Sequence, residues 1–100
     1  MSAMTTLQSR ASVATASGRR YIAQLCSHFA HKLMAAWDDE GGCIEFPFGT
    51  CRLEAVEERL DLEVQAASDD DLGRMEQVIA RHLERFAFRE PMAISWSRAA

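Results

Sequence analysis

Residues 17–34 read SGRRYIAQLCSHFAHKLM and form the longest stretch in which apolar side chains recur at helical spacing. Because successive residues of a helix turn by about 100°, five apolar side chains share one stripe: Ile22, Leu25, Cys26, Phe29 and Leu33. The same rotation groups Tyr21, His28 and Lys32 on one flank and turns His31 away from the stripe. We therefore predict an amphipathic helix whose polar edge carries two of the three histidines.

The composition limits the classes of protein to which the chain can belong. Its 100 residues are 48% hydrophobic, enough for one domain, and its net charge of −4 argues against nucleic-acid binding. No apolar run approaches the roughly 20 residues that cross a bilayer, and residues 1–10 lack the apolar block of a signal peptide. An odd number of cysteines without an export signal favours reduced thiols, so we expect a cytoplasmic protein.

Strands are predicted wherever apolar and polar residues alternate. Residues 1–10 lack this period and are expected to be a flexible N-terminal segment before a single α+β domain over residues 11–98. Alternation predicts strands at residues 11–15, 44–46, 51–55, 60–66 and 92–96. Residues 37–42 are rich in Asp and Gly and are predicted to form a turn.

A hairpin is predicted around residues 46–49, Phe-Pro-Phe-Gly. These residues fit a type I turn whose final glycine takes a left-handed conformation. Pairing Phe46 with Thr50 would leave Cys43 and Cys51 out of register, so a disulfide between them is not favoured.

A second helix is predicted to begin after Ser68. Its hydroxyl can cap the helix, and the three aspartates that follow complement the positive end of the helix dipole. The buried stripe of this helix would be Leu72, Met75, Ile79, Leu83 and Phe86. His82 lies at the edge of that stripe, Arg81 and Arg85 lie further round, and Pro91 prevents the helix from continuing.

The order of elements is therefore strand, helix, about four strands, helix and strand (β-α-β-β-β-β-α-β). Two helices with one apolar stripe each are most economically packed on one face of a sheet. We expect an α+β fold with two layers, in which both helices cover one face of a mostly antiparallel sheet. An uncovered opposite face would favour a homodimer.

The histidines are candidate metal ligands. His28 and His31 are three residues apart and could supply two ligands, with His82 as a third if the fold brings it near. Cys26 cannot join them, because it points about 160° away from His28 on an ideal helix. The alternative is that these histidines are structural or face solvent, and that His82 bonds a neighbouring carbonyl. No cofactor other than such a metal is expected.

Lys32 is a candidate base. Beside Tyr21 and His28 it could be an activated amine, since burial lowers the pKa of a lysine. The alternative is that it buries its stem and keeps its ammonium group in water. The sequence has no CxxC, HExxH, phosphate-binding glycine loop or GxSxG motif, which weakens the interpretation as an enzyme.

Three blocks of the sequence, together with Trp96, resemble a small bacterial family known as domain of unknown function 2218. The blocks are residues 21–22 with 25–32, residues 44–51 and residues 82–90, and the resemblance covers about residues 11–96. It implies no established activity. The residues of these blocks that should be tested as a site are His28, His31, Lys32, Glu45, His82, Arg85 and Glu90. Relatives of this kind occur alone and joined to siderophore-interacting flavoproteins, which implies a link to iron or siderophore metabolism and such a flavoprotein as a partner.

We expect a binding or accessory domain that is not an enzyme, linked to iron or siderophore metabolism. Its candidate ligand-binding residues are Tyr21, His28, His31, Lys32, His82 and Arg85. Two alternatives stay open. One is a metal- or small-ligand-binding protein that uses His28, His31 and His82, and the other is a small enzyme with Lys32 or a histidine as base.

Overall fold

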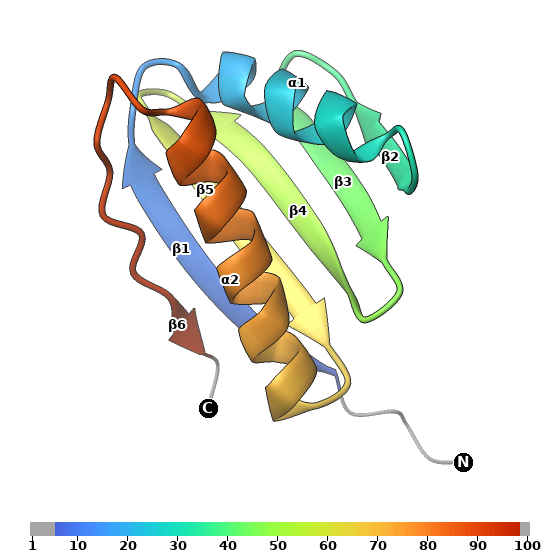
Figure 1. Ribbon diagram of the computed structural model, residues 1–100. Coiled ribbons are helices and arrows are strands. Elements are labelled where there is room, and N and C mark those ends of the chain that lie inside the picture. Colours follow the sequence, from blue (N-terminus) through green and yellow to red (C-terminus); the bar gives the residue numbers. More distant parts are fainter. Residues whose placement is uncertain (1–5, 99–100) are drawn as a thin grey trace.

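The computed structural model describes residues 6–98 and contains six strands and two helices (Figure 1). In chain order these are β1 (Leu7–Ala14), α1 (Gly18–Phe29), β2 (Met34–Trp37), β3 (Gly41–Phe46), β4 (Gly49–Val56), β5 (Arg59–Ala66), α2 (Asp69–Phe86) and β6 (Ser97–Arg98). The predicted α+β class and order of elements are confirmed. No helix in the described range is long and apolar enough to cross a membrane.

All six strands form one antiparallel sheet in the order β2-β3-β4-β5-β1-β6. Strands β2 to β5 pair with their neighbours in sequence, whereas β1 lies between β5 and β6. Helix α1 packs on β2, β3 and β4, and α2 packs on β5, β4 and β1. Both helices therefore cover the same face, as the sequence predicted (Figure 1).

The core lies between the helices and that face of the sheet. Along β5, Leu60, Leu62 and Val64 are buried, while Asp61 and Glu63 alternate with them and are only half-buried. Because side chains of a strand point alternately to its two faces, the apolar set meets the helices and the acidic set lies on the open face. The helices supply a matching set of fully buried side chains: Ile22, Leu25, Cys26, Met75, Ile79 and Leu83.

Helix α2 begins where the sequence indicated. The Ser68 hydroxyl accepts a hydrogen bond of 3.2 Å from the backbone N–H of Asp71, and the first turn carries three aspartates. Both features satisfy the exposed N–H groups of the helix start. The predicted cap of α2 is confirmed.

Helix α1 ends earlier than its spacing suggests. The helical pattern runs to Met34, but α1 ends at Phe29, and Met34–Trp37 form β2 against β3. The backbone N–H of Leu33 donates to the carbonyl of Phe29, which closes a turn between the two elements. Pairing with β3, the next strand along the chain, is a contact that the helical spacing of residues 17–34 does not show, and it overrides the helical period.

The turn predicted over residues 37–42 is confined to residues 38–40. The Asp38 carboxylate accepts hydrogen bonds from the backbone N–H groups of Glu40 and Gly41, and these bonds lower its pKa. Gly42 belongs to β3, where a Cβ would lie 2.7 Å from the Cys26 sulfur, so glycine there lets α1 approach the sheet.

The start of the sheet also differs from the prediction. Strand β1 begins at Leu7, so the flexible segment predicted over residues 1–10 is wrong for residues 7–10. Residues 1–5 lie outside the described range. Ser17 occupies the N-cap position of α1 but makes no capping side-chain bond. The Thr15 hydroxyl accepts from the backbone N–H of Ser17, in the turn that precedes the helix.

The β3–β4 hairpin is present with a shifted register. Phe46 pairs with Gly49 rather than Thr50, and Cys51 lies opposite Ile44. Gly49 is not left-handed, since no glycine among residues 6–98 has a positive φ. It is required for space, because a Cβ there would lie 2.4 Å from the carbonyl oxygen of Gln65. Cys26, Cys43 and Cys51 are free thiols.

The last predicted strand is displaced toward the C-terminus. Met92, Ile94 and Trp96 alternate in burial as expected, but only Ser97 and Arg98 pair with β1. Residues 91–96 therefore run along the edge of the sheet on the β1 side without pairing, and the chain joins the ladder only at Ser97 (Figure 1).

Candidate binding site at the helix seam

The end of α1 and the second half of α2 meet along a seam where two histidines lie together. The ring centroids of His28 and His82 are 5.1 Å apart, with the ring planes inclined by 48°. His28 is exposed and His82 is half-buried. The structure thus brings together two of the candidate residues from different helices.

His82 is held in one orientation. Its Nδ1 lies 2.8 Å from the carbonyl oxygen of Val78, one turn earlier on α2. A carbonyl only accepts, so Nδ1 carries the proton of this bond, and a neutral ring then presents Nε2 as an acceptor or metal ligand. The bond is the structural role considered for His82, and it leaves one nitrogen available.

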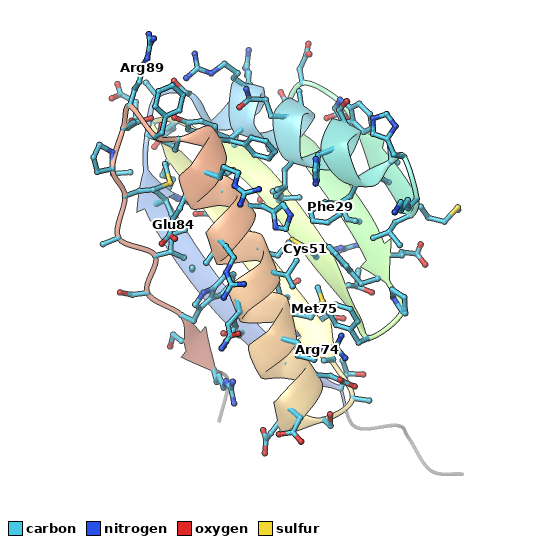
Figure 2. The ribbon with its side chains drawn as sticks, in the orientation of Figure 1. Phe29, Cys51, Arg74, Met75, Glu84 and Arg89 are labelled. Carbon is cyan, nitrogen blue, oxygen red and sulfur yellow. The ribbon has the colours of Figure 1, made fainter. Side chains whose placement is uncertain are left out.

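Aromatic rings form the floor of the seam. The Phe29 ring centroid lies 4.8 Å from that of His82 and 4.9 Å from that of Phe46, and Phe86 contacts His28 at 5.8 Å. Figure 2 shows Phe29 between the two helices, above the sheet. The imidazoles therefore rest on an apolar surface that offers stacking contacts to a ligand.

Tyr21 occupies the other end of the seam. Its side chain is 1% exposed, and its hydroxyl donates a hydrogen bond of 2.7 Å to Glu90, which also accepts one of 2.9 Å from the Thr15 hydroxyl. Burial, followed by the bond to Glu90, raises the pKa of Tyr21. The same bond, followed by that from Thr15, lowers the pKa of Glu90.

A small pocket of about 250 Å³ opens beside this pair. Its walls include the side chains of Arg20, Gln24, Phe86 and Arg89. The Arg20 guanidinium lies 5.3 Å from the Tyr21 ring centroid, within the range of a cation–π contact. The pocket therefore combines an aromatic wall with two cationic groups and the Glu90 carboxylate.

The remaining candidates lie outside this cluster. His31, Lys32 and Arg85 are exposed, and no hydrogen bond or ion pair holds their side chains among residues 6–98. Because α1 ends at Phe29, His31 lies in the following turn instead of one helical turn beyond His28. Within the described range no three His, Cys, Asp or Glu side chains are grouped to hold a metal ion, so the expected site of His28, His31 and His82 is not formed.

Several residues of the seam were not singled out by spacing. Arg20, Gln24 and Arg89 line the pocket, and Glu90 accepts the Tyr21 hydrogen bond. Arg89 and Glu90 had a signal in the sequence, because both lie in one of the resembling blocks. The others depend on the angle at which the helices cross.

The open face of the sheet holds a broader depression of about 1060 Å³. Its charges are largely satisfied by one another: Arg10 pairs with Glu63 at 3.0 Å, and Arg59 pairs with Asp61 at 3.0 Å. Ser12 also donates to Asp61. This is the pattern of a solvated sheet face, so the seam is the better candidate site.

Comparison with known proteins covers almost all of the sheet and both helices. Residues 10–97 match a family described as "Uncharacterized protein conserved in bacteria (DUF2218)". The chain is similar to the NMR structure of PA4090 from Pseudomonas aeruginosa, with 33% sequence identity and a TM-score of 0.78 over 91% of this chain and 95% of that one. No curated protein matches the sequence.

Proposed function

This chain belongs to the uncharacterised bacterial family DUF2218, and from its geometry we propose that it is a non-catalytic binding domain whose working surface is the seam between α1 and α2. The observation that supports this proposal is the meeting of the His28 and His82 rings, 5.1 Å apart, at the surface. Imidazoles over an aromatic floor offer hydrogen bonds and stacking together. Interfaces and ligand sites commonly combine these two kinds of contact.

The exposure of the candidate side chains to solvent favours binding over catalysis. A catalytic base works best where polar groups converge and water is excluded. Lys32 and His28 are exposed, and the pocket at the seam is only about 250 Å³. These observations support recognition of a partner more than transformation of a substrate.

We further propose a siderophore-interacting flavoprotein as the partner, in iron or siderophore metabolism. The support is the resemblance to relatives in which the two are joined in one chain. A domain found fused to an enzyme in some proteins can bind the same enzyme as a separate chain in others.

The test is an NMR titration of the ¹⁵N-labelled chain with a purified siderophore-interacting flavoprotein. We expect chemical-shift changes at His28, Phe29, His82 and Phe86. His28→Ala combined with His82→Ala should weaken binding by about tenfold or more, if the pair contributes as interface centres commonly do.

His31→Ala is the matched control, because His31 is an exposed histidine in the turn after α1 and outside the ring cluster. It should leave the affinity unchanged. Binding that maps to the open face of the sheet, or that survives loss of both seam histidines, would rule out the seam as the working surface.

Metal or small-ligand binding is the second candidate. It is favoured by the bond from His82 Nδ1 to Val78, which leaves Nε2 of His82 beside His28. Two imidazoles form half of a zinc site, so a ligand or partner would have to supply the rest. Zn²⁺ titration followed by NMR should broaden the His28 and His82 signals before that of His31, and unselective broadening of all three would exclude this candidate.

A cytoplasmic location is a further part of the proposal, and the expected homodimer is left to experiment. Three free thiols fit a reducing compartment. The open face of the sheet carries Arg10, Glu63 and Asp61 instead of an apolar patch, so the burial argument for a dimer through that face has no support. Sedimentation velocity decides between monomer and dimer.

A further inference from the structure

We infer that the seam binds an acidic segment of a partner protein, a stretch of chain with several Glu or Asp side chains. This inference rests on the proposed function and names the chemistry of the partner. The surface concerned, the cationic seam, consists of two imidazoles and four arginines: His28, His82, Arg20, Arg81, Arg85 and Arg89. All four arginines are exposed.

The four arginines surround one continuous surface. Arg81 and Arg85 are four residues apart and share one side of α2, and Arg85 is three residues from His82. Arg20 and Arg89 line the same pocket as Phe86, and Phe86 contacts His28 at a ring distance of 5.8 Å. Positive charge therefore flanks the ring cluster along two helices.

Three of these arginines, Arg81, Arg85 and Arg89, have no ion-pair partner among residues 6–98, whereas Arg20 lies close enough to Glu90 to lower the pKa of its carboxyl group. The ion pairs among residues 6–98 engage other arginines, namely Arg10, Arg59, Arg74 and Arg98. Of the two carboxylates nearby in sequence, Glu90 accepts hydrogen bonds from Tyr21 and Thr15. Glu84 lies on the side of α2 that faces away from α1 (Figure 2). The charges of Arg81, Arg85 and Arg89 are thus available to a partner.

The dimensions favour a protein segment over a small molecule. The pocket of about 250 Å³ is below the range of roughly 300 to 1,000 Å³ typical of small-molecule sites, and it suits a single side chain. Next to it Phe88 is 72% exposed, with the Arg89 guanidinium 5.4 Å from its ring centroid. Exposed aromatic and arginine side chains together are typical of protein interfaces, where a segment can contact them in succession.

The charge distribution favours an acidic protein segment over nucleic acid. The chain carries a net charge of −4. A polyanion that extends beyond the cationic seam would be repelled by the rest of the molecule. A short acidic segment would contact only the cationic seam.

The experiment measures binding of a fluorescein-labelled peptide that alternates Glu with Leu and Gly, by fluorescence anisotropy at low salt. The comparison ligands are the same peptide with Gln in place of Glu, an oligothymidylate of equal charge, and inorganic phosphate. We expect the Glu peptide to bind most tightly and its affinity to fall with added salt. Arg85→Gln combined with Arg89→Gln should weaken it by about tenfold or more, since each removes a charge-assisted contact.

The matched control is Arg10→Gln combined with Arg52→Gln, which removes the same charge from the open face. It should change the affinity less than twofold or so. Equal weakening by both pairs of substitutions, equal binding of the Gln peptide, or tighter binding of the oligothymidylate or phosphate would overturn the inference.

The two proposals fail separately. If a siderophore-interacting flavoprotein shifts the His28 and His82 signals but the Arg85 and Arg89 substitutions do not weaken that complex, the acidic-segment inference falls and the seam remains the working surface. If the Glu peptide binds through these arginines while the flavoprotein does not bind, the inference stands and the flavoprotein is the wrong partner.

Discussion

The Tyr21 hydroxyl donates a 2.7 Å hydrogen bond to the carboxylate of Glu90, which lies 69 residues later in the chain. The bond joins the first half of α1 to the segment that follows α2. The acceptor is charged, and such bonds are stronger than those between neutral groups. Tyr21 and Glu90 therefore fix the end of the seam at which the pocket opens.

Tyr21 is expected to titrate above its usual pKa of 10.0, because its burial and its bond to Glu90 both favour the protonated hydroxyl. It is the only tyrosine of the chain, so absorbance at alkaline pH reports it alone. Spectrophotometric titration should give a higher midpoint for the folded protein than for the denatured one. A pKa raised in the folded state contributes stability below pH 10 that is lost as the pH rises further. Equal midpoints would contradict the burial of Tyr21.

Glu90 is expected to make the fold acid-sensitive. Its folded pKa lies below the ordinary 4.5, chiefly because Tyr21 donates to it, so the unfolded chain binds a proton first as the pH falls. The stabilisation is present above pH 4.5 and is lost as the pH falls through the lower folded value. Urea unfolding of Glu90→Gln should show a shallower decline over this range, and the exposed Glu84→Gln is the control. If the free energy of unfolding declines equally with falling pH in Glu90→Gln and in the unmodified protein, Glu90 does not cause the acid sensitivity.

Gly49→Ala should destabilise the protein by more than about 2 kcal/mol. The new Cβ would meet the backbone carbonyl of Gln65, which cannot move cheaply. Gly73→Ala is the matched control: it lies in α2 with its nearest neighbour at 3.6 Å, and alanine should stabilise the helix by about 0.5 to 1 kcal/mol. Thermal unfolding of both variants checks the prediction, and a neutral Gly49→Ala would contradict the close approach of β4 and β5.

Glu57→Gly should stabilise the β4–β5 turn by up to about 1 kcal/mol. Glu57 has a φ of 53°, where an L-residue is strained by roughly 1 to 2 kcal/mol and glycine is not. Glu58, the other residue of the turn, has no positive φ, so Glu58→Gly should be neutral or destabilising. Denaturant midpoints for the two variants should move in opposite directions, and a common direction would count against a left-handed Glu57.

Cys43 should react with a thiol reagent in the native protein, while Cys26 and Cys51 should react only on unfolding. Cys43 is half-buried, whereas the other two thiols are buried. Burial raises the pKa of Cys26 to about 11 and that of Cys51 as well, so neither forms the reactive thiolate at neutral pH. Mass spectrometry after alkylation identifies the labelled thiols. Early labelling of Cys51 would show that the sheet opens locally.

The sequence predicts most reliably the elements whose signals are local and agree with one another. Helix α2 has its cap at Ser68, three acidic residues in the first turn and one stripe of buried side chains. Strand β5 alternates over its whole length. In both cases each residue's preference coincides with its place in the fold.

The parts that differ depend on contacts between separate segments of the chain. Leu33 continues the helical spacing of α1, yet Met34–Trp37 pair with β3, so the helix ends before them. Gly49 has the sequence context of a turn glycine, but glycine is required there because the Gln65 carbonyl of β5 leaves no room for a Cβ. This contact exists only in the folded sheet. Register and close approach are properties of pairs of segments, and one segment alone does not specify them.

The sequence likewise predicts some features of the candidate site and not others. Helical spacing places Tyr21 and His28 on one flank of α1, which is where the seam forms. It does not give the distance from His28 to His82, nor the bond from Tyr21 to Glu90. It also assigns His31 to a helix that has already ended, which is why the predicted metal site is incomplete.

The place of β1 in the sheet affects how the protein is made. Strand β1 leaves the ribosome before the other described elements, but its main partner is β5, with Leu7 opposite Ala66 and Ala14 opposite Arg59. At about 5 to 20 residues per second, translation keeps β1 without that partner for several seconds. During this interval the β2–β5 meander can close, and a nascent β1 exposes both of its edges to chaperones or to other chains.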